Sequence, residues 1–284
     1  MSANSSSVRL PGYIIQQLNS FVSTVAPGLK PRFQTAMIRA SYSTVSVILK
    51  NEDSAFLNYG YTPLDSDAAV LKLDPDDETD RFSIQLYSRV AGGRDLRGKD
   101  VLEIGCGRGG GASFVARYLH PASLTAVDLS ARAVRCCQRR HRIEGLRFLR
   151  GEAEHLPLPS KSFDAVVNVE SSHCYPSFER FLDEVGRVLR PNGVFLFADI
   201  RPREEIAKLR ERLQERFTVV EEEFITANVI RALELDSDRK SLLIQKRAPK
   251  FLHPALQAFA SVNGSPTFDA FTSGALQYVR FVLQ

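Results

Sequence analysis

His173 and Asp199 are the two side chains whose types and positions point most directly to chemistry. Each stands shortly beyond an apolar run typical of a strand, at 163–169 and at 194–198. Both are therefore expected at the carboxyl edge of a parallel sheet, where ligands of open α/β sheets collect. A neutral imidazole can take the proton of a hydroxyl nucleophile, and a neighbouring carboxylate can orient the ring and stabilise the imidazolium. We predict a general base, His173, supported by Asp199; the alternatives are that His173 caps a helix beginning near Ser177 and that Asp199 only holds a loop.

A cluster of glycines follows the apolar run 101–104. Glycine lets the chain turn sharply and lets a ligand approach the main chain where a Cβ would collide. The next apolar run ends at Asp128, where a carboxylate can accept two hydrogen bonds from a ribose diol. Together these features predict a cofactor that contains adenosine, although a tight turn without a ligand would explain the glycines alone.

Two glycine patterns overlap in this loop, and they indicate different cofactors. Gly105, Gly107 and Gly110 satisfy the dinucleotide pattern G-x-G-x-x-G. Glu103 followed by Gly105, Gly107 and Gly109 satisfies the E-x-G-x-G-x-G pattern of methyltransferases that use S-adenosylmethionine (SAM). The glycines alone do not decide between the two, and the carboxylate of Glu103 has a structural alternative, which is to order the loop by accepting from its N–H groups.

Three segments further along the chain, 151–157, 162–167 and 188–193, favour SAM. In order and spacing they resemble the remaining motifs of class I SAM-dependent methyltransferases. The resemblance implies that Glu152 accepts from the adenine amino group and that the backbone of Ala153 donates to the ring. The full set of cofactor-binding residues implied in this way is Glu103, Gly105, Gly107, Gly109, Asp128, Leu129, Glu152, Ala153, Glu154 and Asn168.

Shorter runs such as 109–113, 169–176 and 198–202 narrow the resemblance to the phthiotriol/phenolphthiotriol dimycocerosates methyltransferases of mycobacteria. Those enzymes O-methylate a hydroxyl of a long-chain lipid diol. The resemblance is densest from 100 to 205. The chain departs from the family pattern at three points: Tyr59-Gly60 stands in place of Trp-Ala, Gly105 in place of serine, and Glu152 in place of aspartate.

This resemblance implies transfer of a methyl group from SAM to a hydroxyl of a hydrophobic small molecule, such as a lipid or polyketide-type natural product, which leaves S-adenosylhomocysteine. Tyr59 and Tyr61 are amphipathic aromatics separated by a glycine, and they suit a lid over an apolar substrate. Their alternative is an aromatic contact that ties the N-terminal helices to the sheet. Glu170 and Tyr175 are further candidates for substrate contact. For Glu170 the alternatives are that it faces the amino group of the cofactor and that it simply ends a strand.

Other functions remain open at this point. An N- or C-methyltransferase on the same scaffold is the nearest alternative, because an amine can react without a base and a histidine base also serves carbon acids. An NAD-dependent oxidoreductase fits the glycine loop but not the later motifs, and a non-catalytic SAM-binding protein is the third alternative. No metal site is predicted, because methyl transfer from a sulfonium requires none.

The elements that must position these residues alternate between strands and helices from residue 99 onward. Strands are predicted at 101–104, 124–127, 147–149, 163–169, 194–198, 217–222 and 276–283, and helices at 112–119, 178–189 and 203–216. Such alternation requires right-handed crossovers and a parallel sheet covered on both faces. The fold class predicted is α/β, a Rossmann-like class I methyltransferase sheet of seven mostly parallel strands with a helical cap. The run 276–283 is expected to be an edge strand.

Three regions follow from this division. Residues 1–98 would form an N-terminal helical cap and lid, with apolar residues at helical spacing from 14 to 25, a second apolar segment at 33–49 and a loop at 51–80. Residues 99–200 would form the SAM-binding core. Residues 201–284 would add cap helices and the final antiparallel strands. The apolar stripes of the first region also fit a homodimer contact.

Composition limits the partners. With 44% hydrophobic and 25% charged residues the chain is typical of a globular protein and excludes a disordered or coiled-coil one. The net charge of +4 is spread among acidic residues, so no nucleic acid is expected as partner. The four cysteines lack metal-ligand spacing, and no apolar run reaches the ~20 residues of a membrane span or resembles a signal peptide. We therefore expect a cytoplasmic protein that meets its acceptor from the aqueous side.

Overall fold

The structure, a computed structural model, describes residues 55–65 and 71–284. The helices expected in the first fifty residues, and with them most of the N-terminal cap, lie outside the described residues. The described part of that cap holds the 3₁₀ helix Pro75–Asp80, inside the predicted loop, and the helix α3 (Arg81–Ala91), which was not predicted. Among the described residues, no helix combines the length and the apolar character needed to cross a bilayer.

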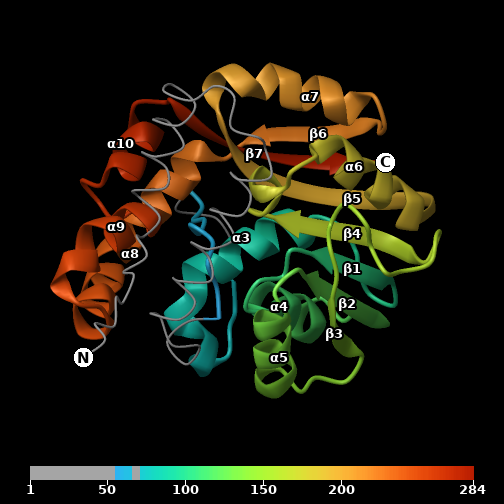
Figure 1. The fold of residues 1–284 in the computed structure, drawn as a ribbon, viewed down its shortest axis with the longest axis horizontal. Coiled ribbons are helices and arrows are strands. Elements are labelled where there is room, and N and C mark those ends of the chain that lie inside the picture. Colours follow the sequence, from blue (N-terminus) through green and yellow to red (C-terminus); the bar gives the residue numbers. More distant parts are fainter. Residues whose placement is uncertain (1–54, 66–70) are drawn as a thin grey trace, which may run out of the picture.

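A seven-stranded sheet forms the centre of the molecule (Figure 1). Its strands are β1 (Asp100–Ile104), β2 (Ser123–Asp128), β3 (Leu146–Arg150), β4 (Phe163–Val169), β5 (Leu189–Pro202), β6 (Val219–Phe224) and β7 (Leu276–Leu283). They lie in the order β3-β2-β1-β4-β5-β7-β6. The first five are parallel, and β7 is antiparallel to both of its neighbours. The predicted fold class, a mostly parallel Rossmann-like sheet, is confirmed.

The inner strands form because they can be buried on both faces. In β1 and β4 all but one residue each is buried, which matches the nearly continuous apolar runs that parallel strands need. The order of the strands reverses at β1, whose neighbours β2 and β4 lead away in opposite directions. A sheet whose strand order reverses in this way has a crevice at the carboxyl ends of its central strands, and ligands bind in that crevice.

The prediction that 276–283 is an edge strand was wrong. β7 lies between β5 and β6 and pairs with both, and its last six residues, Tyr278–Leu283, are all buried. A strand with apolar side chains on both faces needs cover on both sides, so it is inserted into the sheet. The edge is taken by β6, whose three consecutive glutamates at 221–223 remain partly exposed, as is typical of an edge that resists further pairing.

Eight α-helices lie within the described residues and cover the sheet or extend beyond it. They are α3, α4 (Gly110–Tyr118), α5 (Ala131–Arg140), α6 (Phe178–Val188), α7 (Ile206–Gln214), α8 (Thr226–Arg247), α9 (His253–Phe259) and α10 (Pro266–Thr272). The helix predicted at 178–189 is α6, and every position of its apolar stripe that falls within it is buried. It ends one residue early because β5 already begins at Leu189.

Two apolar clusters hold the layers together, one on each face of the sheet. One packs α3 and α4, with parts of α8 and α10, against the sheet; the other packs α6 and α7. Figure 1 shows α8, α9 and α10 as a separate helical layer on the side toward which the arrow of β4 points. These helices therefore stand beyond the carboxyl edge of the sheet, where a cap over a ligand would be.

Candidate active site

A cavity of about 560 Å³ opens at the carboxyl ends of β1 and β4, the edge where the strand order reverses. Most of the predicted site residues line it: Gly105, Gly107, Asp128, Leu129, Glu152, Ala153, Glu154, Glu170 and Tyr175. Glu103, Gly109, Asn168, Tyr59, Tyr61, His173 and Asp199 do not. The cavity size lies within the range of small-molecule and cofactor sites.

The glycine loop is shaped by its own backbone conformation and by Asp128. Gly105 and Gly107 have positive φ values of 78° and 54°, which side chains with a Cβ rarely adopt. The Asp128 carboxylate accepts from the backbone N–H of Gly107 at 2.9 Å and of Ser130 at 2.8 Å. Burial raises the pKa of Asp128, although these two hydrogen bonds act in the opposite direction. Asp128 therefore orders the loop and keeps lone pairs for a diol in the cavity.

Gly109 is required for packing. It precedes α4 with a φ of 78°, and a Cβ there would lie 2.9 Å from atoms of the His141 and Phe148 side chains. Its predicted contact with the cofactor stays a prediction, because the described contacts of Gly109 are with protein. The Nε2–H group of His141 donates to the carbonyl of Arg108 at 3.0 Å.

Two buried oxygens beside the glycine loop have no hydrogen-bond partner among the described residues. One is Oε2 of Glu103, whose other oxygen accepts from the Tyr87 hydroxyl at 2.7 Å. The other is Oδ1 of Asn168, whose amide nitrogen donates to the carbonyl of Ile104. A buried acceptor without a donor is costly. An ammonium group such as that of SAM supplies donors of the right kind, so these residues fit the cofactor that the motifs predict.

Burial raises the pKa of Glu103 to about 7, with the Tyr87 hydrogen bond opposing the shift. The folded protein therefore binds this proton more tightly than the unfolded chain, whose value is near 4.5, and stability falls as the pH rises from 4.5 to 7. In Glu103→Gln this loss is absent. Between pH 5 and pH 8 the variant should gain up to about 3 kcal/mol relative to the unchanged protein, measured by urea unfolding at both values.

If the free energy of unfolding had the same pH dependence in the wild type and in Glu103→Gln, the raised pKa of Glu103 would be contradicted. The same variant tests the link to the cofactor through a separate readout. Because the amide no longer offers a charged acceptor, SAM affinity measured by calorimetry should fall even where the variant is the more stable protein. Tyr87→Phe, which removes only the partner hydroxyl, is the matched control: it should push the pKa of Glu103 further upward.

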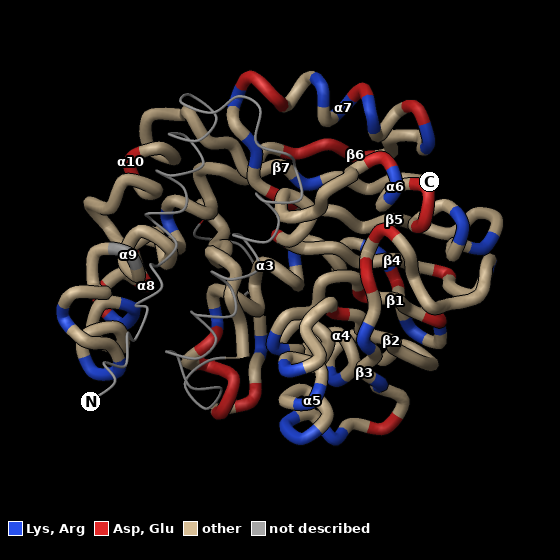
Figure 2. The backbone as a smooth tube through the Cα atoms, in the orientation of Figure 1, with Lys and Arg blue, Asp and Glu red and all other residues tan. Residues whose placement is uncertain are grey.

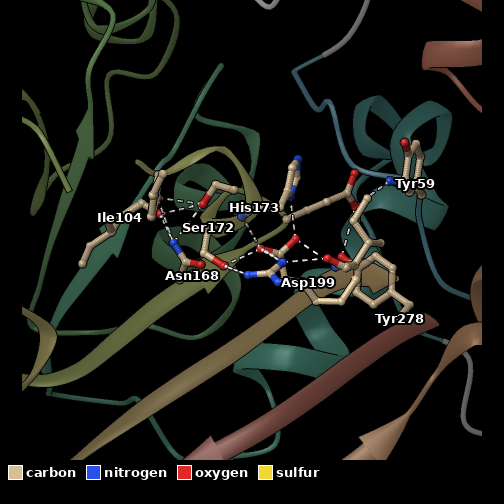
Figure 3. Close-up of polar contacts among 12 residues, drawn as sticks. Tyr59, Ile104, Asn168, Ser172, His173, Asp199 and Tyr278 are labelled. Carbon is tan, nitrogen blue, oxygen red and sulfur yellow. Dashed lines mark hydrogen bonds and ion pairs between the residues drawn. The ribbon is translucent and has the colours of Figure 1, made fainter. Parts of the chain in front are cut away.

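His173 and Asp199 are brought together at the ends of β4 and β5. The Nδ1 atom of His173 lies 2.7 Å from Oδ1 of Asp199, and the backbone N–H of His173 donates to Oδ2 at 2.9 Å (Figure 3). Asp199 is fully buried and also accepts from Ser172 and pairs with Arg201. The alternative that His173 caps a helix is wrong, since Ser177 caps α6 with its own hydroxyl.

The charges around this pair act on both groups. Burial favours the neutral form of both His173 and Asp199, but the neighbouring charges and hydrogen bonds outweigh this effect for both groups. The charges of His173 and Arg201 hold the pKa of Asp199 well below its usual range. Cys174 and the Asp199 carboxylate raise the pKa of His173 well above the ordinary 6.5. The dyad is therefore an ion pair in the free protein at neutral pH, and the imidazole becomes a base as the pH rises.

His173 opens into a smaller cavity of about 160 Å³. Tyr175 lines both cavities. His173 itself lies between Ser171 and Cys174 in the sequence, and both of these line the larger cavity. His173 is therefore next to residues of the predicted cofactor site, although it lines only the smaller cavity.

Glu170 is a second acid or base candidate, whereas the sequence predicted for it a contact with the cofactor amino group or with the substrate. It follows β4 with a φ of 51°, in the left-handed region that non-glycine residues seldom occupy. Its Oε2 atom accepts from the backbone N–H of Tyr59 and from the hydroxyl of Tyr278, each at 3.0 Å. Burial raises its pKa to about 7. Strained residues of this kind cluster at functional sites.

Tyr59 and Tyr61 do not line either cavity. The ring of Tyr59 packs edge-on against Phe271 of α10, with ring centres 5.4 Å apart, and burial raises its pKa. The backbone of Tyr61 donates to the carbonyl of Phe82. These contacts favour packing for both tyrosines, and a lid over the substrate stays a prediction. Their neighbours Phe56, Leu57 and Asn58 line the larger cavity instead.

Several residues of the site could not be found from local sequence. Tyr87 lies on the helix that was not predicted, and Tyr278 lies in a strand that was placed at the wrong position. Arg201 could have been noticed only as a charged residue near the end of an apolar strand, a feature that does not by itself indicate a role. In the described part of the chain there is no group of three histidine, cysteine, aspartate or glutamate side chains arranged to hold a metal ion.

Comparison with known proteins extends these observations. The profile of a family described as a methyltransferase domain matches residues 102–197. A phthiotriol/phenolphthiotriol dimycocerosates methyltransferase of Mycobacterium tuberculosis is 44% identical over 234 residues, which cover 81% of this chain and 85% of the relative. A fatty-acid O-methyltransferase of Mycolicibacterium smegmatis is 44% identical over 212 residues, covering 74% and 77%.

Solved structures show the same fold at lower sequence identity. The [4+2]-cyclase SpnF superimposes with a TM-score of 0.65 at 20% identity and covers 87% of this chain and 94% of its own. The cyclopropane synthase MmaA2 of Mycobacterium tuberculosis gives a TM-score of 0.61 at 16% identity, with 82% and 93% covered. At this level of identity the similarity concerns the fold alone.

Proposed function

We infer that this chain, which belongs to the phthiotriol/phenolphthiotriol dimycocerosates methyltransferase family of class I SAM-dependent methyltransferases, transfers the methyl group of SAM to a hydroxyl of a lipid-type acceptor. The observation that carries the proposal is the pairing of two features at one sheet edge. One is the cavity between the glycine loop and Asp128, and the other is the His173–Asp199 dyad beside it. The names of the relatives support the acceptor class.

When bound, SAM supplies an electrophilic methyl group on a sulfonium. In this chain Asp128 would accept from the ribose, and Glu152 and Ala153, which line the same cavity, would face the adenine. The orphaned oxygens of Glu103 and Asn168 would accept from the ammonium group. Asp128, Glu152 and Ala153 thus offer polar groups from the cavity wall, and Glu103 and Asn168 offer acceptors from the buried layer beside the glycine loop.

The proposed role of His173 is to take the proton of the acceptor hydroxyl. When SAM and the acceptor are bound, Nε2 of the imidazole would accept the proton of the hydroxyl that receives the methyl group, and S-adenosylhomocysteine would be the other product. Asp199 holds Nδ1 at 2.7 Å and stabilises the resulting imidazolium. Positioning of this kind, together with proton removal, accounts for catalysis without a covalent intermediate.

Glu170 is the alternative proton acceptor. It lines the larger cavity, whereas His173 does not, and a carboxylate whose pKa is about 7 is a competent base at neutral pH. A carboxylic acid is the alternative acceptor, supported by the fatty-acid O-methyltransferase among the relatives. A carboxylate oxygen is already ionised, so its methylation would need neither base.

The test has two stages. Calorimetry with SAM and, separately, with NADH should give binding of SAM alone; binding of NADH alone would overturn the proposal. Labelled SAM is then offered with a long-chain diol, a fatty acid, a quinol and a long-chain amine, and the products are identified by mass spectrometry. We expect an O-methyl ether from the diol. An ester from the fatty acid would reassign the acceptor, and a methylated amine or ring carbon would overturn O-methylation of a hydroxyl.

A further inference from the structure

The end of α8 and the turn that follows it expose large apolar side chains to solvent. Leu242 is 65% exposed and Phe251 is 72% exposed, the two highest values among the large apolar residues described. Lys246 and Lys250 are exposed in the same stretch. We call these four residues, Leu242, Lys246, Lys250 and Phe251, the α8 tip. Large apolar side chains exposed beside basic ones are the combination that interfacial segments present to a lipid surface.

The helix itself explains why these side chains face outward. Ile244 is 3% exposed and packs into a small cluster with Leu256 and Val262, so this face of α8 is turned toward α9. Leu242 and Lys246 are four residues apart and therefore lie together on another face of the helix. The 3₁₀ helix Lys250–Leu252 then carries Lys250 and Phe251 onward from the helix end.

The α8 tip lies in a basic stretch of the chain. From residue 239 to residue 268 the sequence holds five lysines and arginines and no aspartate or glutamate. Figure 2 shows the basic residues gathered at the free end of α8. Neither Lys246 nor Lys250 forms an ion pair with any residue that the structure describes, whereas arginines such as Arg187 and Arg210 are paired.

We propose that the α8 tip docks the protein on an anionic lipid surface. Phe251 and Leu242 enter the boundary between headgroups and acyl chains, while Lys246 and Lys250 bind the phosphates. Interfacial segments bind membranes through the same combination of apolar insertion and basic contacts. The tip belongs to the helical layer that Figure 1 shows beyond the carboxyl edge of the sheet, and the larger cavity opens at this same edge. The proposal rests on the proposed function, because an acceptor held in a lipid layer has to be collected there.

Co-sedimentation with vesicles tests this docking directly. Wild-type protein should bind vesicles of equal parts phosphatidylcholine and phosphatidylglycerol, bind phosphatidylcholine vesicles far more weakly, and be released by salt. Lys246→Glu/Lys250→Glu should weaken binding at least about 25-fold, since each basic residue near such a surface contributes about fivefold. Phe251→Ser should weaken it about tenfold and make the remaining binding more sensitive to salt.

Matched controls keep the result specific to the α8 tip. Lys99→Glu/Lys161→Glu makes the same charge change at two exposed lysines that precede β1 and β4, at the opposite edge of the sheet. Val220→Ser removes an exposed apolar side chain from β6. Both controls should bind vesicles as the wild type does. Equal losses in the tip and control variants would overturn the docking site, and so would wild-type protein that ignores anionic vesicles.

Activity separates failure of the docking proposal from failure of the proposed function. The tip variants should methylate a water-soluble short-chain acceptor at the wild-type rate, yet lose methylation of a long-chain acceptor held in anionic vesicles. Loss of both activities would indicate a folding defect, which thermal unfolding of each variant checks; Lys246→Gln/Lys250→Gln then repeats the test. Vesicle binding by a protein that methylates neither acceptor would leave docking intact and overturn the function.

Discussion

Replacing His173 by alanine is expected to lower kcat for a hydroxyl acceptor by about 10³-fold, the range typical of a lost general base. SAM affinity should stay unchanged, because His173 does not line the cavity assigned to the cofactor. The pH dependence provides an independent check. The pKa of His173 lies well above 6.5, so wild-type kcat should rise with pH as the imidazole loses its proton, and the variant should lose that rise.

Two further variants identify the base. Asp199→Asn keeps the shape of the dyad but removes the charge that raises the pKa of His173, so its kcat should fall while its pH profile shifts to lower pH. Glu170→Gln should still show the rise of kcat with increasing pH. If His173→Ala retains full activity and Glu170→Gln loses it, the proton acceptor is Glu170 and His173 only holds the strand ends together. Titration of SAM into each variant distinguishes lost chemistry from lost binding.

Gly111→Ala is expected to destabilise the protein by about 3 kcal/mol, although alanine favours helices. A Cβ at this position of α4 would lie 2.0 Å from two ring carbons of Tyr87. That ring is 6% exposed and its hydroxyl is bonded to Glu103, so it has little room to move away. Because Tyr87 lines the cavity, SAM binding should weaken about tenfold as well. Urea unfolding and calorimetry measure the two effects.

Gly186→Ala is the matched control. Gly186 also lies inside a helix, α6, but the atom nearest to its added Cβ is a ring carbon of Phe217 at 3.9 Å. With no collision, the same substitution should stabilise the protein by about 0.5–1 kcal/mol and leave SAM affinity unchanged. If both variants were equally stable, the close packing of α4 on α3 would not be the reason for glycine at position 111.

The central strands could be predicted because strands that are buried on both faces need apolar residues at nearly every position. β1, β4 and the middle of β5 are nearly continuous apolar runs, and their order along the chain is enough to place the ends of β4 and β5 side by side. This is why His173 and Asp199 could be paired before their 2.7 Å contact was seen. The glycine loop and Asp128 followed from the same reasoning, because the loop follows β1 and Asp128 ends β2.

The helices of the C-terminal cap could not be predicted in this way. The buried positions of α8 include Asp236 and Ser237 beside Val229 and Leu233, so polar residues interrupt the apolar stripe that would mark a helix. Asp236 is buried only because Arg239 and Lys240 pair with it. The spacing of apolar residues does not reveal a helix face whose buried positions include ion-paired side chains. The segment therefore showed no clear helical periodicity in the sequence.

Long-range partners were the other limit. The hydrogen bonds of Glu170 reach Tyr59 and Tyr278, each more than a hundred residues away. The bond between Tyr87 and Glu103 joins a helix to the strand that follows it. No local spacing records which side chain will complete such a pair. The sequence therefore located the strand ends that line the predicted site, but it could not decide whether Tyr59 and Tyr61 form a lid or an aromatic packing contact, and their described contacts favour packing.

The insertion of β7 between β5 and β6 has a consequence for the order in which the site is assembled on the ribosome. Residues 100–202 can pair as they emerge, since each parallel strand joins one already made. β6 has no partner until residues 276–283 have been synthesised, because β7 is its only neighbour. Glu170 likewise receives the second of its two hydrogen bonds, the one from Tyr278, only at that step, after the one from Tyr59. A nascent chain that already carries the glycine loop, His173 and Asp199 therefore still lacks the strand that closes the sheet and completes the contacts of Glu170.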